Sequence, residues 1–335
     1  MVEAPVLSGP TMRRTVRIAG LVVLFAIAFV AAWIRLPYYA VGPGPASDVG
    51  PLIDVQGVPR YPSSGKLIMT TVRWQQVTAL HALVAWIDDA QFIVGEDVIY
   101  PPGLDRQQEQ ERAISQMDQS KIDASIVVLS ELFDYPDEHG DGALIEATGP
   151  DCPADGELFV GDLVVAIDGR RIDSTRAARR AIDGVPLDEP VAFRVRAGGE
   201  SHDIELVREP CAGSEEPLVG INMVDAFPFR IEISSGDVGG PSGGLMFALG
   251  LYDTLTPGDL TDGRTIAGTG TITPVGEIGG IGGIADKVIG AERAGASVFL
   301  VPAQNMPELD GVDTGAMRLV SVATFDDAVE ALRVS

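Results

Sequence analysis

The sequence contains few histidines and cysteines, the side chains on which zinc sites and many hydrolytic sites are built. Its 335 residues include three histidines and two cysteines, and aromatic residues make up 6% of the chain. The histidines (His81, His139 and His202) lie far apart without metal-ligand spacing, and Cys152 and Cys211 form no C-x-x-C pair. A metal site made of thiolates or imidazoles is therefore not predicted, and no cofactor is expected.

Positive charge is also scarce. Lys and Arg number 24 against 48 Asp and Glu, which gives a formal net charge of −24. An acidic protein repels the phosphate backbone, so a nucleic-acid partner is not predicted. The G-x-x-x-x-G-K-[ST] motif is absent as well, because Gly65-Lys66 is followed by Leu67 and Arg60 stands in place of the first glycine. ATP binding through a P-loop is therefore not expected.

A long uncharged run lies near the N-terminus. Residues 18–34 read IAGLVVLFAIAFVAAWI, and Arg13, Arg14 and Arg17 precede them. As a helix this run would span about 26 Å, the short end of a bilayer crossing. The arginines predict a single-pass cell-membrane anchor with a cytoplasmic N-terminus and an extracytoplasmic remainder. A cleaved signal peptide is one alternative, although the apolar run is longer than signal peptides usually have. A buried core helix is the other, and the three arginines at one end disfavour it.

The stretch from residue 37 to 124 contains no pattern of residues that indicates a catalytic or binding site. Residues 67–72 (LIMTTV) are typical of a buried strand, and the apolar spacing within 77–87 predicts a helix. Residues 105–125 are rich in Gln, Asp and Glu and indicate a polar helix. We therefore expect a β-containing region here, without a function that the residues reveal.

A glycine-rich pattern defines the next module. Residues 153–169 read PADGELFVGDLVVAIDG, and alternating apolar residues at 191–195 predict a strand after it. Over residues 125–212 this pattern resembles a bacterial PDZ domain, which implies binding of extended protein segments at a sheet edge. A β-rich spacer that binds nothing is the alternative. Cys152 and Cys211 bracket the module, and a disulfide or two buried thiols are both open.

The segment with the clearest chemical pattern surrounds a serine. Residues 235–253 read SGDVGGPSGGLMFALGLYD, which predicts a sharp turn followed by a buried helix. Unpaired backbone N–H groups at a helix start can stabilise an oxyanion, so Ser242, between Gly240 and Gly243, is a candidate nucleophile. Serine is equally a favoured helix N-cap, so the segment alone leaves both roles open.

A nucleophilic serine needs a base, and the histidines fit poorly. An α/β hydrolase places its acid and histidine after the serine in the chain, whereas all three histidines precede Ser242. A His-Asp-Ser order is formally open, but no histidine lies in a segment that looks built to orient a base.

Lys287 is the remaining candidate base. Val288 and Ala291 share one helical face, and Lys287 falls within that apolar arc. Burial would lower its pKa from about 10.4 toward the neutral form that a general base requires. A lysine that reaches water from the edge of the face is the alternative.

Four blocks in order resemble the proteolytic domain of Lon over residues 213–335. They are the PSGG turn with its LMFALGLYD helix, GTGTI at 268–272, GEIGGIGGIADK at 276–287 and GASVFLVPAQN at 295–305. The resemblance implies a Ser–Lys dyad of Ser242 and Lys287, with Thr269 hydrogen-bonded to the lysine. Many Lon enzymes carry an Asp two residues before the proline. This chain has Gly239 there, so how the turn is held stays open.

The whole arrangement resembles the PDZ-containing Lon-like proteases of Gram-positive bacteria. The predicted fold class is α+β multidomain: a cytoplasmic tail and transmembrane helix (1–36), a β-containing membrane-proximal region (37–124), a PDZ domain (125–212) and a Lon-type α/β proteolytic domain (213–335). The predicted function is an ATP-independent, membrane-anchored serine endopeptidase that cleaves extracytoplasmic proteins, unfolded or PDZ-selected. Lon-type domains tend to form rings, so the resemblance implies a hexamer. The alternative is a PDZ-based adaptor whose peptidase domain is silent or processes only itself.

Overall fold

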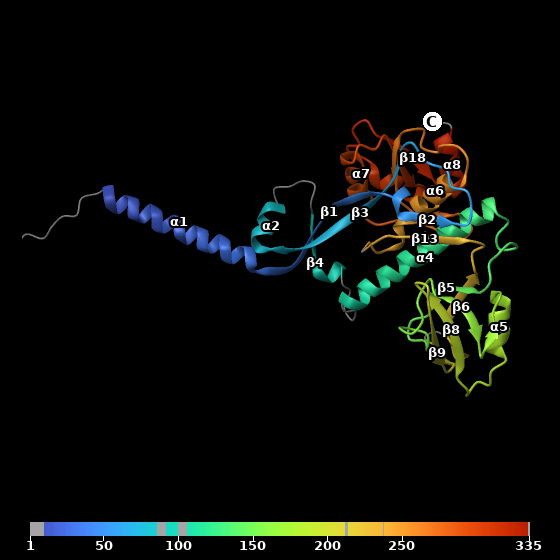
Figure 1. The fold of residues 1–335 in the computed structure, drawn as a ribbon. Coiled ribbons are helices and arrows are strands. Elements are labelled where there is room, and N and C mark those ends of the chain that lie inside the picture. Colours follow the sequence, from blue (N-terminus) through green and yellow to red (C-terminus); the bar gives the residue numbers. More distant parts are fainter. Residues whose placement is uncertain (1–9, 86–91, 100–105, 212–213, 237, 334–335) are drawn as a thin grey trace, which may run out of the picture. The chain divides into compact units, whose positions relative to one another are not determined.

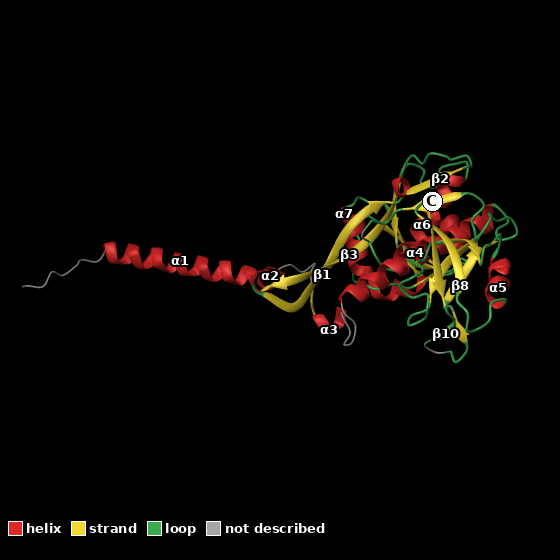
Figure 2. Cartoon of the chain, turned by 60° about the horizontal axis from the view of Figure 1, so that its bottom comes forward, coloured by secondary structure: helices red, strands yellow, loops and turns green. Residues whose placement is uncertain are grey.

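The computed structural model describes residues 10–85, 92–99, 106–211, 214–236 and 238–333. The chain divides into two compact units, Met1–Pro43 with Val72–Leu104 and Gly44–Thr71 with Asp105–Ser335. Helices and strands are present in both units (Figures 1 and 2). This division does not test the boundaries expected from the sequence at residues 36, 124 and 212, which stay predictions.

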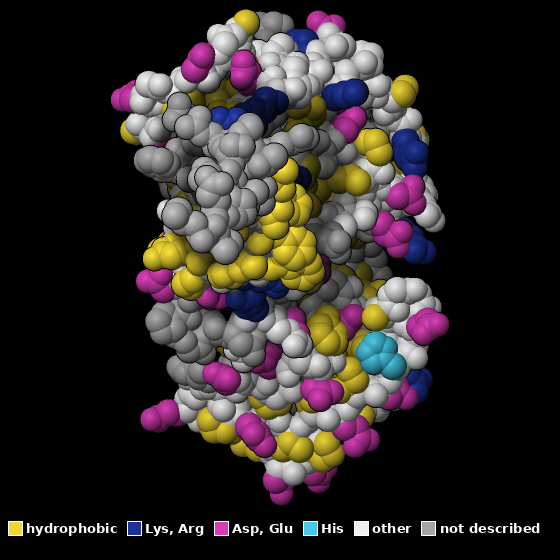
Figure 3. All heavy atoms as spheres, turned by 90° about the vertical axis from the view of Figure 1, so that its left-hand side faces the viewer, with side chains coloured by type: hydrophobic (Ala, Val, Ile, Leu, Met, Phe, Trp, Pro, Cys, Tyr) yellow, Lys and Arg dark blue, Asp and Glu magenta, His cyan; other side chains and the backbone are white. Residues whose placement is uncertain are grey.

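Within its described residues, the first unit contains three helices, the whole of one strand and parts of two others. The helices are α1 (Pro10–Trp33), α2 (Ala79–Ala85) and α3 (Glu96–Ile99). Strand β4 (Phe92–Gly95) pairs antiparallel with the first half of β1 (Arg35–Asp48). Large apolar side chains of this unit are exposed, among them Phe25 and Trp33, and hydrophobic side chains are prominent on the face shown in Figure 3.

The predicted transmembrane anchor is wrong. Among the described residues, no helix combines the length and the apolar character that a bilayer crossing requires. Helix α1 ends at Trp33, so its uncharged part from Ile18 covers 16 residues (33 − 18 + 1). At 1.5 Å per residue that part measures about 24 Å, short of the roughly 30 Å hydrocarbon core. The fold is mixed α/β with sheets and helices, and the expected single-pass location in the cell membrane has no support.

A largely parallel sheet forms the centre of the second unit. Its strands there follow the order β18 (Arg318–Val322), β17 (Val298–Pro302), β14 (Thr265–Gly268), β3 (Lys66–Thr78) and β1. The pairs β18–β17, β17–β14 and β14–β3 are parallel. Strand β3 begins one residue before the stretch 67–72 that the sequence indicates as a buried strand.

Helices cover both faces of this sheet. Met69, Ile266 and Leu300 belong to one buried cluster with α6 (Gly244–Leu255) and α8 (Phe325–Arg333). The intervening residues Ala267 and Phe299 belong to another cluster, with α7 (Ile284–Arg293). Successive strand side chains point to opposite faces, so α6 and α7 lie on opposite sides of the sheet. Helix α6 is almost wholly apolar and is buried all round, as its sequence predicts.

The PDZ-like module is an antiparallel sheet with one helix. Its strand order is β12 (Ile221–Asp225), β5 (Ala143–Thr148), β6 (Leu163–Ile167), β8 (Val191–Ala197) and β9 (Glu200–Leu206), with the short β7 (Arg170–Arg171) beside β6. Helix α5 (Thr175–Asp183) starts at Ser174, whose side chain accepts a hydrogen bond from the Ala177 N–H. Strand β12 lies at the sheet edge.

A disulfide joins Cys152 and Cys211, 59 residues apart. It lies against Gly220, where a Cβ atom would collide with the Cys152 side chain. The choice that the sequence left open is therefore settled in favour of the disulfide.

Helix α4 (Arg106–Leu132) contacts both the peptidase core and the PDZ-like module. Met117 and Ala124 pack in the core around α6, while Ile122 and Leu129 pack with Leu144 and Val224 of the module. The helix begins within the stretch 105–125 indicated by the sequence and continues seven residues beyond it. The remaining short elements are η1 (Gly50–Leu52), β2 (Ile53–Gln56), β10 (Glu209–Pro210), β11 (Pro217–Leu218), β13 (Arg230–Ile233), η2 (Pro241–Gly243), β15 (Thr271–Ile272), β16 (Ile278–Gly279) and η3 (Ala303–Leu309).

Candidate active site

Ser242 lies in the short turn η2, immediately before helix α6. Gly240 opens the turn with a φ of 88°, a conformation that favours glycine. Gly243 is buried, and a Cβ there would come within 2.6 Å of the Met69 Sδ. The N-cap of α6 is Gly243, with no side-chain capping bond. Ser242 is therefore not the N-cap of α6.

The structure places Lys287 against this serine. The lysine lies in the first turn of α7 and is 4% exposed, on the face that also buries Val288 and Ala291. Its Nζ donates to Ser242 Oγ over 2.7 Å. The reading in which this side chain reaches water is therefore wrong.

Thr269 connects the two residues. Its side chain is fully buried just after β14, and Oγ1 accepts a hydrogen bond from Lys287 Nζ over 3.0 Å. The same hydroxyl donates to the Ser242 carbonyl over 3.0 Å. The Gly270 N–H donates to that carbonyl as well, over 2.9 Å. Three elements, η2, the end of β14 and α7, thus fix the separation of the serine and the lysine.

Burial sets the charge state of the lysine. Desolvation lowers the pKa of Lys287 from 10.5 to about 8, because a buried ammonium loses its hydration. A noticeable fraction of the side chain is then neutral near physiological pH. A neutral amine within hydrogen-bond distance of a serine hydroxyl is the arrangement that general-base activation of a nucleophile requires.

The residues around Ser242 and Lys287 lie in a segment that matches a known family. Residues 221–334 match the family model described as the Lon protease (S16) C-terminal proteolytic domain. This part of the chain is therefore similar to a Lon-type proteolytic domain, and residues 221–334 are called the Lon-type domain below. The match contains the serine, the lysine and Thr269.

Curated relatives share this domain over part of their length. Lon protease 2 of Herpetosiphon aurantiacus is 35% identical over 108 residues, 32% of this chain and 13% of that protein. The Lon protease of Desulfatibacillum aliphaticivorans is 31% identical over 120 residues, 35% of this chain and 14% of that protein. The chain therefore covers less than a sixth of these relatives.

Solved PDZ domains are similar to about a quarter of the chain. The PDZ domain of the SdrC-like protein Lmo2051 from Listeria monocytogenes is 28% identical and covers 25% of this chain and 87% of that chain, with a TM-score of 0.21. The PDZ domain of the SdrC-like protein Lin2157 from Listeria innocua is 24% identical and covers 25% and 93%, with a TM-score of 0.22.

The three histidines belong to other elements than Ser242. His139 lies in the loop before β5, with its ring against the Gly140 carbonyl, and His202 lies exposed on β9 of the PDZ-like module. His81 belongs to α2 in the other unit. Within the described ranges, no group of three or more His, Cys, Asp or Glu side chains is arranged to hold a metal ion.

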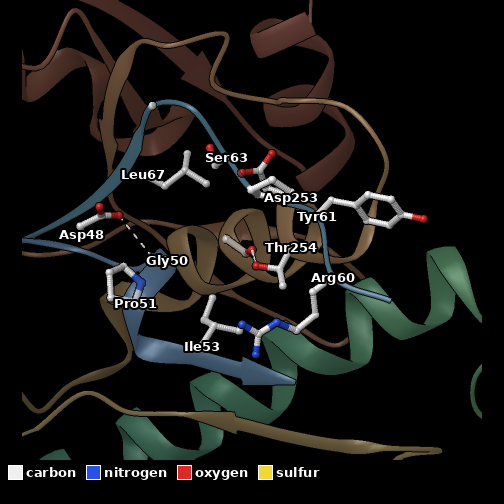
Figure 4. Close-up of a pocket in the computed structure, with 13 residues that line it drawn as sticks. Asp48, Gly50, Pro51, Ile53, Arg60, Tyr61, Ser63, Leu67, Asp253 and Thr254 are labelled. Atoms are coloured by element: carbon white, nitrogen blue, oxygen red, sulfur yellow. Dashed lines mark hydrogen bonds between the residues drawn. The ribbon is translucent and has the colours of Figure 1, made fainter. Parts of the chain in front are cut away.

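The Lon-type domain also contributes to a pocket away from the serine. The pocket measures about 490 Å³ and lies between residues 48–67 and helix α6 (Figure 4). Asp253 of α6 lines it, and burial raises the pKa of that carboxyl. Ser242 and Lys287 are not among the lining residues, so this hollow does not mark the place of a scissile bond.

The residues that hold the serine turn from outside the Lon-type domain are not predicted by the sequence. Ala113 and Ser120 of α4 hydrogen-bond to Gly240 and Pro241. They are separated from the turn by more than 120 residues of chain (241 − 120 = 121). Their polar helix has no motif that points to a catalytic site, so only the folded chain reveals the contact.

Proposed function

We propose that this chain is a serine endopeptidase in which Ser242 is the nucleophile and Lys287 its general base. The observation that carries the proposal is the hydrogen bond of 2.7 Å between Lys287 Nζ and Ser242 Oγ, made by a lysine that is 4% exposed. The match of residues 221–334 to a proteolytic domain supports the same conclusion. Thr269, Gly240 and Gly243 are the proposed supporting residues.

The mechanism follows from the charge states. Neutral Lys287 takes the proton of the Ser242 hydroxyl while Oγ attacks the carbonyl carbon of a peptide bond. Backbone N–H groups at the start of α6 stabilise the tetrahedral oxyanion. The lysine ammonium then gives its proton to the leaving amine, and the acyl-enzyme forms. A water molecule, deprotonated by the lysine, attacks the ester and releases the acid and free Ser242.

Thr269 serves two purposes in this scheme. Its hydroxyl proton is directed to the Ser242 carbonyl, so the Oγ1 lone pairs are free to accept from Lys287 Nζ. That acceptor directs one N–H bond of the lysine away from the serine. A neutral amine oriented in this way turns its lone pair toward the Ser242 hydroxyl, which donates to it as the reaction begins.

The substrates that fit this arrangement are extended or unfolded polypeptides. The edge strand β12 of the PDZ-like module offers the kind of edge to which an extended peptide adds as a further strand. The sequence has no P-loop motif, so the proposed cleavage does not use ATP. A homo-oligomeric ring is part of the proposal through the likeness to Lon alone.

The test is cleavage of an unfolded protein such as casein by the full chain without ATP. Ser242→Ala and Lys287→Ala should each abolish cleavage and keep the fold, as measured by circular dichroism. Ser234→Ala, which changes an exposed serine eight residues earlier in the chain (242 − 234), is the matched control and should cleave normally.

The outcomes of this test separate the peptidase from its alternatives. Normal turnover by Ser242→Ala would refute the mechanism. No cleavage by the wild type, together with no labelling of Ser242 by a phosphonylating probe, would favour the PDZ-based adaptor. Fragments of the chain itself that disappear in Ser242→Ala, with casein left intact, would restrict the activity to self-processing.

A further inference from the structure

The turn that carries Ser242 rests on helix α4. The Gly240 N–H donates to the Ala113 carbonyl over 2.7 Å. Gly239 lies so close to the same residue that a Cβ at position 239 would come within 2.9 Å of the Ala113 Cβ. Contact with the helix thus requires a residue without a side chain at 239, the position where many Lon enzymes carry Asp.

A second residue of α4 contacts the turn one residue before the nucleophile. Ser120 is 3% exposed, and its Oγ donates to the Pro241 carbonyl over 2.9 Å. The same oxygen would lie 2.6 Å from a Cβ at position 244, so Gly244 leaves it just enough room. Ala113 and Ser120 are seven residues apart and therefore lie on one face of the helix, two turns from each other.

These contacts bear on the reaction because the serine and the lysine come from separate elements. Lys287 is placed by α7, whereas Ser242 moves with its turn. A shift of the turn would lengthen the 2.7 Å hydrogen bond between them. Proton transfer and attack depend steeply on such distances, and a misplacement of about 1 Å can cost roughly a hundredfold in rate.

We propose that α4 is a positioning element of the active site, with Ser120 and Ala113 as positioning residues that hold the nucleophile turn. The proposal rests on the peptidase function proposed above. With Gly239 in place of the Asp of many Lon enzymes, the sequence leaves open how the turn is held. The proposal assigns that role to two residues of α4, which lies outside the segment that matches the Lon-type domain.

The experiment compares two serine substitutions in the same helix of the full chain. Ser120→Ala removes the hydrogen bond to the turn. Ser125→Ala is the matched control, because Ser125 is equally buried but its hydroxyl donates within the helix, to the Lys121 carbonyl over 2.8 Å. Cleavage of an unstructured fluorogenic peptide gives kcat and KM separately for each variant.

The expected result is a split between the two kinetic constants. Ser120→Ala should lower kcat about tenfold and change KM by less than about twofold, because the turn is misplaced but the peptide contacts remain. Ser125→Ala should keep kcat within about twofold of the wild type. The pH midpoint of the reaction should stay unchanged in both, because the burial of Lys287 does not depend on either hydroxyl.

A compensating pair keeps the proposal testable if Ser120→Ala is poorly folded. Gly239→Ala should lower kcat because its methyl group pushes the turn away from Ala113. Adding Ala113→Gly removes the opposing methyl group and should restore a severalfold part of the lost rate. A role in stability alone would not produce this rescue, since glycine within a helix destabilises it further.

Two results would overturn the proposal. One is an equal kcat for Ser120→Ala and Ser125→Ala, with the wild type active. The other is a double variant no faster than Gly239→Ala alone. A wild type without Ser242-dependent cleavage would instead refute the peptidase function itself, so the two failures are distinguishable.

Discussion

The ionisation of Lys287 should govern the rate at which Ser242 is acylated. Burial lowers the pKa of this lysine from 10.5 to about 8. Only the neutral amine accepts the serine proton, so the rate should follow the neutral fraction. At a pKa of 8 that fraction is about 9% at pH 7 and about 91% at pH 9, a tenfold difference.

The same numbers show what burial contributes to catalysis. A lysine with the ordinary pKa of 10.5 would be neutral only about 0.03% of the time at pH 7. The shift of 2.5 (10.5 − 8) raises the neutral fraction at pH 7 about 300-fold. Because the cause is desolvation, the gain depends on keeping water away from the first turn of α7.

The assay is the rate of covalent labelling of Ser242 by a phosphonylating probe between pH 6 and pH 10.5. The rate should rise with a midpoint near pH 8 and level off above pH 9. Lys287→Arg keeps a positive charge at this position but cannot become neutral in this range, so its labelling should be nearly lost at every pH. Hydrolysis of the probe without protein supplies the baseline.

Two results would refute the reasoning. A midpoint near pH 6.5 would indicate a histidine as the base. A rate that continues to rise beyond pH 10 would indicate a lysine exposed to water, as in the alternative considered from the sequence. Either result would disagree with the burial of Lys287 and its contact with Thr269.

Two further predictions concern stability. Asp123 of α4 is buried with one carboxylate oxygen unpaired, and burial, followed by the charge of Glu146, raises its pKa from 3.8 to about 7. A raised carboxyl pKa lowers stability as pH rises from 3.8 to 7, so urea unfolding of Asp123→Asn should show a gain of roughly 2–4 kcal/mol at pH 8 and less than half of that gain at pH 5. Equal gains at both pH values would contradict this. Replacing Cys152 and Cys211 by serine opens a loop of about 60 residues and should cost about 4 kcal/mol of unfolding free energy. Thermal unfolding measures this cost against the oxidised wild type, and the reduced wild type is the control that should behave like the variant. A variant whose midpoint equals that of the oxidised wild type would contradict the loop argument.

Local patterns in the sequence predict several elements well. The alternation of Val191, Phe193 and Val195 predicts strand β8, where these side chains are buried. The nearly continuous apolar run after Ser242 predicts the buried helix α6. In both cases the period of the pattern matches the period of the structure, and no partner far along the chain is needed to recognise it.

The same kind of local reasoning fails at the N-terminus. The apolar run beginning at Ile18 is long enough to suggest a bilayer crossing but lies at the lower limit of length. The helix ends at Trp33, one residue before the end of the apolar run, and helix ends are the least reliable part of a prediction from sequence. An apolar run at this limit of length therefore does not establish by itself that its helix crosses a bilayer.

The candidate site could be predicted from the sequence only in part. The position of Lys287 on an apolar helix face predicts its burial, but nothing local says which serine it meets. Its pairing with Ser242 came from the resemblance to Lon, since the two lie 45 residues apart and on different elements. Thr269 is likewise assigned by resemblance, and the structure adds that its hydroxyl also reaches the Ser242 carbonyl.

Neither the local sequence patterns nor the resemblance to Lon predicts which residues hold the turn that carries Ser242. Within the Lon-type domain alone, Gly239 looks like the loss of the Asp side chain that many Lon enzymes carry at this position. In the folded chain the absence of a side chain at position 239 allows the turn to approach Ala113, and the Ser120 hydroxyl donates a hydrogen bond to the carbonyl of Pro241, the residue before Ser242. A departure from a family pattern can therefore mark a contact with a segment outside the family domain. Here that segment is α4, several of whose other residues pack against the PDZ-like module, so the turn that carries Ser242 contacts a helix that also contacts this module.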